Sequence, residues 1–353
     1  MLPHSLSPRL FLLAASLAAV LTPICLAAPA PSNTQQPLGG QTQDGQPPKE
    51  TPQRMLPVPF IPLPGHGAAL VYLRINGKEG ATFLVDTGAD GNFITESLVA
   101  RLGLKPYPAL GDDGIPLKPF GTPLFYADVS SLSLPAVKGT ETGTLDITLT
   151  NSAAAFAVVT PEQLGQGFFV DGSLGAPFLK EEAVSFDFVS RTMGIAYPGG
   201  LSPTQVEALG FGGKGGAVLP LTRCNGNCVS VPATLSDGQS SRRVDLEVDT
   251  GGVSTLIPLE TAKALSLKSV GTEEILGGTA GKRVLGRVEL PSLALGEVQL
   301  TNLTVSTTQS LAIPTPPKAG EDPSAHLGMD ILKNYRVLID YPAKVMYIQP
   351  NSP

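Results

Sequence analysis

The sequence predicts a mainly β protein built from two similar lobes, and three observations support this fold class. Many short apolar runs lie between turn signals, a pattern typical of strands. Gly and Pro are abundant, with 39 and 34 copies among 353 residues, and helical heptads are absent. Third, the two halves of the chain repeat each other, which predicts closed β lobes related by a pseudo-two-fold axis. The length leaves room for a separate core in each lobe.

The repeat is anchored by one tripeptide that occurs twice, each time after an apolar run. Further segments keep the same order in both halves, and their spacing differs only where loops change length. The matched pairs are Asp86-Thr87-Gly88 with Asp249-Thr250-Gly251, Phe93-Ile94 with Leu256-Ile257, Leu174-Gly175 with Leu327-Gly328, and residues 184–188 with residues 337–341.

The N-terminus has the layout of a secretory signal peptide, predicted here as residues 1–28. Arg9 precedes an apolar run from Leu10 to Leu21, and small residues follow. About a dozen apolar residues are too few to span ~30 Å of hydrocarbon, so we expect no membrane span after signal removal. Residues 29–54 are rich in Gln and Pro and are expected to be a disordered leader. We therefore expect an exported protein, periplasmic or secreted.

The elements of each lobe follow from local signals. Asn76-Gly77 and Asp237-Gly238 each predict a hairpin whose second strand ends at an acid. Helices are expected over residues 96–102 and 259–265, and the segments 184–188 and 337–341 are expected to close the sheets. The predicted boundaries are an N-terminal lobe over 55–197, a linker over 198–215 with a helical stretch at 202–209, and a C-terminal lobe over 216–353.

Cysteine content, charge and histidine content limit the other function classes. Cys224 and Cys228 flank an Asn-Gly turn, and in an oxidising compartment they are expected to form a disulfide. Only His66 and His326 remain after signal removal, so no four-ligand zinc site and no cofactor are predicted. The formal net charge is −6, and the sequence shows no basic stripe of the kind that nucleic-acid binders use.

Two strands can each deliver a carboxylate to one cleft, and two such carboxylates can hydrolyse a peptide bond through a water that they share. Carboxylates roughly 3 Å apart cannot both ionise easily, so one stays protonated and the pair titrates as a unit. The ionised partner takes a proton from water, and the protonated one stabilises the oxyanion. We therefore expect Asp86 and Asp249 to form a catalytic dyad, with no assignment of the proton to either. Gly88 and Gly251 let backbone N–H groups approach the carboxylates.

Both halves resemble the retropepsin-like fold of aspartic proteases, and the whole resembles exported bacterial members of that group. The resemblance is carried by the two Asp-Thr-Gly segments, the two Leu-Gly segments and the tail from Leu327 to Tyr341. It implies that Thr87 and Thr250 hydrogen-bond across the two loops. It also implies that the Leu174-Gly175 and Leu327-Gly328 segments support those loops. A hairpin flap is implied too, with candidate residues Gly277, Gly278 and Gly281.

The chain departs from the family pattern at several positions. Ser173 and His326 stand where the family prefers an apolar residue. Ala89 and Gly252 replace a hydroxyl that would lower the pKa of the neighbouring carboxylate, so we expect an activity maximum at roughly pH 5–7. Glu247 shares the face of Asp249, but we expect it at the surface or rim, because Leu84 occupies the matching place.

The sequence therefore predicts an aspartic endopeptidase acting on polypeptide substrates as a monomer with an internal pseudo-dimer. Two alternatives stay open. The first is a non-catalytic protein that binds extended peptides in the cleft between the lobes. In the second, each lobe pairs with its equivalent in another chain.

Overall fold

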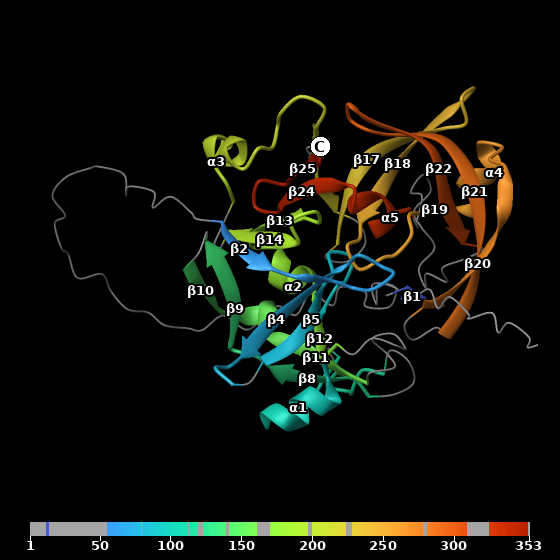
Figure 1. Cartoon of the computed structure of the whole chain (residues 1–353). Helices are drawn as coiled ribbons and strands as arrows, with labels where there is room; N and C mark the ends of the chain where they lie inside the picture. The colour runs from blue at the N-terminus through green and yellow to red at the C-terminus, as the bar shows by residue number, and fades with distance from the viewer. Residues whose placement is uncertain are drawn as a thin grey trace, which may run out of the picture.

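The computed structural model describes residues 12–13 and 55–351, apart from 79, 112, 119–122, 139–140, 161–169, 197–199, 224–227, 278–280 and 309–324. The mainly β class and the two lobes are confirmed (Figure 1). The described helices are short: α1 (Glu96–Leu102), the 3-10 helix η2 (Asn151–Ala153), α2 (Ala176–Leu179), α3 (Pro203–Ala208), α4 (Leu259–Ala264) and α5 (Met329–Leu332). None of these described helices is long and apolar enough to cross a membrane. Apart from residues 12–13, the expected signal peptide and leader fall outside the described part of the chain.

The N-terminal lobe is built on one sheet with the order β10-β9-β4-β5-β12-β6-β11-β8-β7, in which β3 also pairs with β4. Its strands are β3 (Ile61–Pro62), β4 (Ala69–Ile75), β5 (Gly80–Val85), β6 (Asn92–Thr95), β7 (Tyr107–Pro108), β8 (Phe125–Asp128), β9 (Ser131–Lys138), β10 (Glu141–Thr148), β11 (Ala155–Val159) and β12 (Gly172–Leu174).

The C-terminal lobe has the order β1-β20-β21-β22-β19-β23-β18-β17-β16, and an additional pairing of β21 with β17 closes it. Its strands are β1 (Leu12–Leu13), β16 (Thr222–Arg223), β17 (Val229–Ser236), β18 (Ser241–Val248), β19 (Leu256–Pro258), β20 (Ser269–Gly277), β21 (Gly281–Leu295), β22 (Val298–Thr308) and β23 (His326–Leu327).

A third sheet is shared by both lobes and has the order β15-β25-β24-β13-β14-β2. It lies between the two lobes in Figure 1. Its strands are β2 (Leu56–Pro59), β13 (Ala183–Asp187), β14 (Thr192–Ala196), β15 (Ala217–Pro220), β24 (Tyr335–Asp340) and β25 (Val345–Pro350). At its centre Ser185 pairs with Leu338, its own equivalent in the repeat. A two-fold axis relates equivalent residues, so the pseudo-two-fold axis passes through this pair.

The predicted hairpins form because their turn residues accept positive φ angles. Asn76 and Gly77 join β4 to β5 with φ of 49° and 69°, and Gly238 joins β17 to β18 with φ of 93°. Helix α1 begins after Thr95, whose side chain accepts a hydrogen bond from the Leu98 N–H, and it ends at the left-handed Gly103. Both acids therefore sit where the sequence predicted, just after the second strand of a hairpin.

The linker between the lobes is tied to the shared sheet. Helix α3 begins with a capping box between Ser202 and Gln205. The buried Asp340 carboxylate accepts hydrogen bonds from the N–H groups of Leu201 and Ala343, at 2.9 and 3.0 Å. Asp340 thus has a structural partner for each oxygen, which fixes the start of the linker against β24.

Candidate active site

The two Asp-Thr-Gly loops meet at the junction of the lobes. Asp86 follows β5 and Asp249 follows β18, and their exposed fractions are only 5% and 3%. A Cβ atom placed on Gly251 would lie 2.4 Å from Asp86 Oδ1, so the backbone of the second loop lies directly against the first carboxyl group. Glycine is required at this position because no side chain has room there.

The two carboxyl groups are held alike by backbone N–H groups, and they interact with each other. The Gly88 N–H donates to Asp86 Oδ1 and the Gly251 N–H donates to Asp249 Oδ1, both at 3.0 Å. Burial, the charge of Asp249 and a hydrogen bond with the Asp249 side chain raise the pKa of Asp86 well above its usual range, against the lowering effect of the Gly88 N–H. The arrangement favours one proton shared between the two groups.

Thr87 and Thr250 join the loops by reciprocal hydrogen bonds. The Thr87 N–H donates to Thr250 Oγ1 at 3.1 Å, and the Thr250 N–H donates to Thr87 Oγ1 at 3.0 Å. Each hydroxyl then donates across the axis, Thr87 to the Val248 carbonyl at 2.7 Å and Thr250 to the Val85 carbonyl at 2.8 Å. These four buried bonds fix the separation of the two loops.

Strands β12 and β23 support the loops in the same way. The Asp86 N–H donates to the Leu174 carbonyl at 2.9 Å, and the Asp249 N–H donates to the Leu327 carbonyl at 3.1 Å. A Cβ on Gly175 would lie 2.2 Å from the Gly91 carbonyl oxygen, which explains why a glycine follows the leucine.

Asn92 and Thr255 complete this support and were missed by the sequence reasoning. The Gly175 N–H donates to Asn92 Oδ1 at 2.9 Å, and the Gly328 N–H donates to Thr255 Oγ1 at 3.1 Å. Both side chains are buried. They occupy equivalent places after the acid of each half, so the repeat itself carried the signal.

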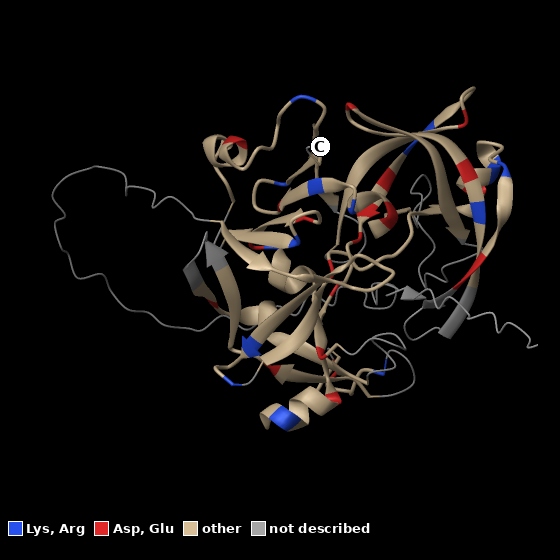
Figure 2. Cartoon of the chain, in the orientation of Figure 1, with Lys and Arg blue, Asp and Glu red and all other residues tan. Residues whose placement is uncertain are grey.

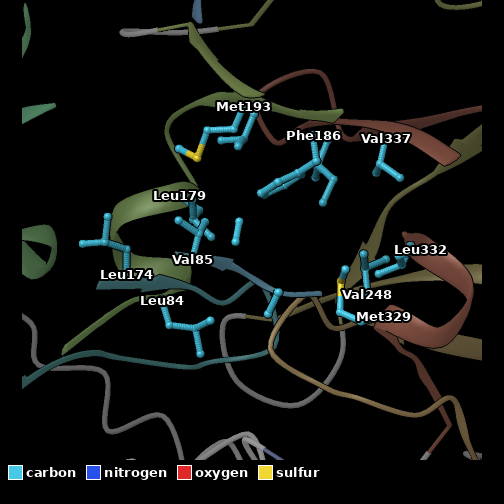
Figure 3. Close-up of a cluster of buried hydrophobic side chains, with 14 of the residues drawn as sticks. Leu84, Val85, Leu174, Leu179, Phe186, Met193, Val248, Met329, Leu332 and Val337 are labelled. Atoms are coloured by element: carbon cyan, nitrogen blue, oxygen red, sulfur yellow. The ribbon is translucent and has the colours of Figure 1, made fainter. Parts of the chain in front are cut away.

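Behind the loops, apolar side chains from both lobes form one cluster. Figure 3 shows Val85, Leu174, Leu179, Phe186 and Met193 from the first half packed with Val248, Met329, Leu332 and Val337 from the second. The loops therefore rest on a core that belongs to neither lobe alone.

His326 and Glu247 break the symmetry of the site. They are cross-strand partners in β23 and β18, and their side chains are 13% and 15% exposed. His326 Nδ1 lies 3.4 Å from Asp249 Oδ2, and its Nε2 lies 3.9 Å from Glu247 Oε2. Our expectation that Glu247 lies at the surface or rim is therefore wrong. Its side chain packs beside the carboxyl pair, with its Oε2 atom facing the His326 ring.

The comparisons with known proteins agree with this geometry. A family model described as aspartyl protease matches residues 71–111 and 231–331, segments that contain both Asp-Thr-Gly motifs. The chain has the two-lobe aspartyl protease fold.

Two solved structures of similar shape are those of basic 7S globulin from soybean and of conglutin gamma, a basic 7S globulin from lupine seeds. Each shares 12% sequence identity, and each comparison covers 85% of this chain and 96% of the other, with TM-scores of 0.48 and 0.45. The search of curated proteins found no match.

The aspartyl protease fold implies a flap, and the candidate lies in a hairpin of the C-terminal lobe. Strands β20 and β21 pair as far as Gly277 opposite Gly281. The third candidate, Gly278, falls outside the described residues. In the middle of β20, Glu273 accepts a hydrogen bond from the Ser254 side chain at 3.3 Å, and Ser254 follows the second Asp-Thr-Gly loop. The hairpin is thus joined to that loop, while its role as a flap stays a prediction.

Two further side chains lie against the loops of this aspartyl protease fold. His66 is buried, and burial lowers its pKa to about 4 although the charge of Asp249 raises it. Cys228 is buried with its Sγ atom 3.2 Å from both the Gly88 carbonyl oxygen and Asp90 Oδ1. The predicted disulfide partner, Cys224, falls outside the described residues.

Proposed function

We propose that the protein is an aspartic endopeptidase that hydrolyses peptide bonds with a water activated by Asp86 and Asp249. The observation that supports this most is the reciprocal threonine pairing, which holds two buried carboxyl groups side by side. The raised pKa of Asp86 supports a pair that holds a single shared proton. The substrate would be a polypeptide, because two carboxyl groups in this arrangement suit addition of water to an amide carbonyl.

The surface charge agrees with this substrate class. In Figure 2, charged residues of both signs are scattered over the described elements of both lobes and do not form one basic band. No group of three or more His, Cys, Asp or Glu side chains among the described residues is arranged to hold a metal ion. The N-terminal apolar run supports the further proposal that the peptidase is exported, to the periplasm or beyond.

The test is cleavage of a diverse peptide mixture between pH 3 and 8 by the purified protein, beside Asp86→Asn and Asp249→Asn. We expect cleavage by the parent and at least a ~10³-fold loss in each variant, because neither carboxyl group can do the chemistry alone. Asp187→Asn is the matched control. Asp187 caps a turn through the Val189 and Ser190 N–H groups and lies outside the site, so this variant should still cleave.

Full cleavage by either active-site variant would contradict the paired mechanism. Peptide binding by the parent without cleavage, surviving in Asp86→Asn, would instead identify a peptide-binding cleft.

A further inference from the structure

The carboxyl pair lies in an asymmetric electrostatic environment, although the backbone around it is symmetric. In the N-terminal lobe the pair of residues facing each other across the strands is Ser173 and Leu84. In the C-terminal lobe the equivalent pair is His326 and Glu247. A charged pair thus replaces a neutral one on a single side of the axis, next to Asp249.

We propose that His326 is a positioning residue that keeps the negative charge of the carboxyl pair on Asp249 and leaves the shared proton on Asp86. This inference rests on the proposed function and deepens it, because it assigns a separate role to each carboxyl group.

The first support is the placement of the imidazole. Its two nitrogens face two different carboxyl groups, with Nδ1 3.4 Å from Asp249 and Nε2 3.9 Å from Glu247. Because a carboxyl group faces each nitrogen, the surrounding charge favours the doubly protonated imidazolium form. Burial lowers the pKa of His326, but the charges of Glu247 and Asp249 outweigh it and raise the pKa to about 9.

The second support is Glu247, which matches the imidazolium with an opposite charge. Its Oε1 atom is buried and has no hydrogen-bond partner among the described residues. Burial raises the pKa of Glu247 to about 7 against the opposing effect of His326. Below that pH Glu247 becomes neutral, and Asp249 is then the main anion that faces the imidazolium.

Other titratable groups act on His326, on Glu247 or on His66. Asp86 acts on His326 through space, and Asp90 and Cys228 act on Glu247. On the other side of Asp249, His66 is neutral above a pKa of about 4, and Lys333 acts on His66. Within the described residues, His326 is thus the cation in direct contact with the pair.

The assignment defines each proton transfer. The water oxygen adds to the amide carbonyl carbon while one water proton passes to Asp249 and the Asp86 proton passes to the carbonyl oxygen. The resulting gem-diol then returns one hydroxyl proton to Asp86. Asp249 gives its proton to the leaving nitrogen as the C–N bond breaks, and both carboxyl groups recover their starting states.

The location of the proton can be tested without activity by following the His326 imidazole with NMR from pH 5 to 10 in the full chain. Its signal is identified by its loss in His326→Gln. We expect a titration midpoint well above 6.5 in the parent. Asp249→Asn should lower that midpoint by about one unit or more, because it removes an adjacent anion. Asp86→Asn should lower it less than Asp249→Asn does, because Asp86 makes the smaller contribution to the pKa of His326.

The pH profile of cleavage provides the functional arm. In His326→Gln, loss of a positive charge beside the pair should move both limbs of the profile upward by about one pH unit. Ser173→Ala changes the equivalent position of the other lobe and should leave both limbs in place. If His326→Gln does not fold, Glu247→Gln is used in its place. The NMR titration midpoint of His326 in Glu247→Gln should fall toward 6.5.

Three results would overturn the assignment. The first is a His326 titration midpoint at or below 6.5 in the parent, and the second is a midpoint that falls more in Asp86→Asn than in Asp249→Asn. The third is a folded His326→Gln variant whose pH profile of cleavage keeps both limbs in place. Absence of cleavage by the parent would refute the proposed function alone, and the NMR midpoints would still decide where the charge lies.

Discussion

Glu182 is a buried carboxyl group outside the candidate site, at the junction of α2 and β13. It is 2% exposed, and its Oε2 atom has no hydrogen-bond partner among the described residues. Burial, with a smaller effect of the Glu181 charge, raises its pKa to about 8. In the unfolded chain the pKa is near 4.5. Between these values the unfolded state binds fewer protons than the folded state, so Glu182 makes the protein less stable as pH rises.

We therefore predict that Glu182→Gln stabilises the protein at pH 8.5 and changes little at pH 4. Gln imitates the protonated carboxyl group and cannot ionise, so the gain at high pH should be on the order of 2–4 kcal/mol. Thermal unfolding of parent and variant at the two pH values measures it. Glu181→Gln removes only the smaller effect of the Glu181 charge, so its gain at pH 8.5 should be smaller. An equal gain at both pH values in Glu182→Gln would contradict the ionisation argument.

His326 and Glu247 show what the sequence could and could not predict at the residue scale. The acids, the threonines and the glycines follow from the repeat, because their roles are the same in both halves. Glu247 was misjudged because it was compared with Leu84 alone. The informative signal was that both members of one cross-strand pair change together. Leu84 and Ser173 pair in the first half, and Glu247 and His326 take their places in the second. Such coupled differences indicate a new contact, here between His326 and Glu247 beside Asp249.

At the scale of elements, the two Asp-Thr-Gly loops depend on each other through their threonine hydroxyls. Each hydroxyl accepts one backbone N–H and donates to one backbone carbonyl of the other loop or strand. Removal of one hydroxyl leaves two buried polar groups unsatisfied, at a cost of about 1–3 kcal/mol each.

We predict that Thr87→Val and Thr250→Val each destabilise the protein by roughly 2–4 kcal/mol. The two losses should be similar, because the two sets of bonds are related by the axis. Urea unfolding gives the free energies, and Thr87→Ser and Thr250→Ser serve as controls that keep the hydroxyl. A Val variant as stable as its Ser control would show that these bonds do not hold the lobes together.

The local elements were predictable, whereas the pairing between lobes was not. Hairpins and helices follow from turn residues and capping residues close in sequence, as with β4–β5 and α1. Segments 184–188 and 337–341 were expected as apolar closing strands, and they largely coincide with β13 and β24. An apolar run, however, shows only that a strand is buried. It does not show that the two strands pair with each other, because that pairing joins residues far apart in sequence.

At the scale of the whole molecule, one chain supplies both carboxyl groups, both halves of the threonine pairing and both sides of the shared sheet. The contacts that a homodimer of single lobes would make between chains are already made within this one.

We therefore predict that the specific activity is constant on dilution from micromolar to nanomolar concentration and that the purified protein sediments as a monomer. Analytical ultracentrifugation and initial rates per mole of enzyme measure this. A rate per mole that falls steeply with dilution would instead support lobes that pair between chains.

The shared sheet also affects how the chain can fold during synthesis. Strand β13 pairs on one side with β14, which follows it at once, and on the other side with β24. Residues 188–334 must be made before β24 exists, which takes roughly 7–30 s at ~5–20 residues per second. Throughout this time the first lobe presents an open strand edge with an apolar face, a template for aggregation. The arrival of β24 pairs this edge of β13 and removes it from solvent.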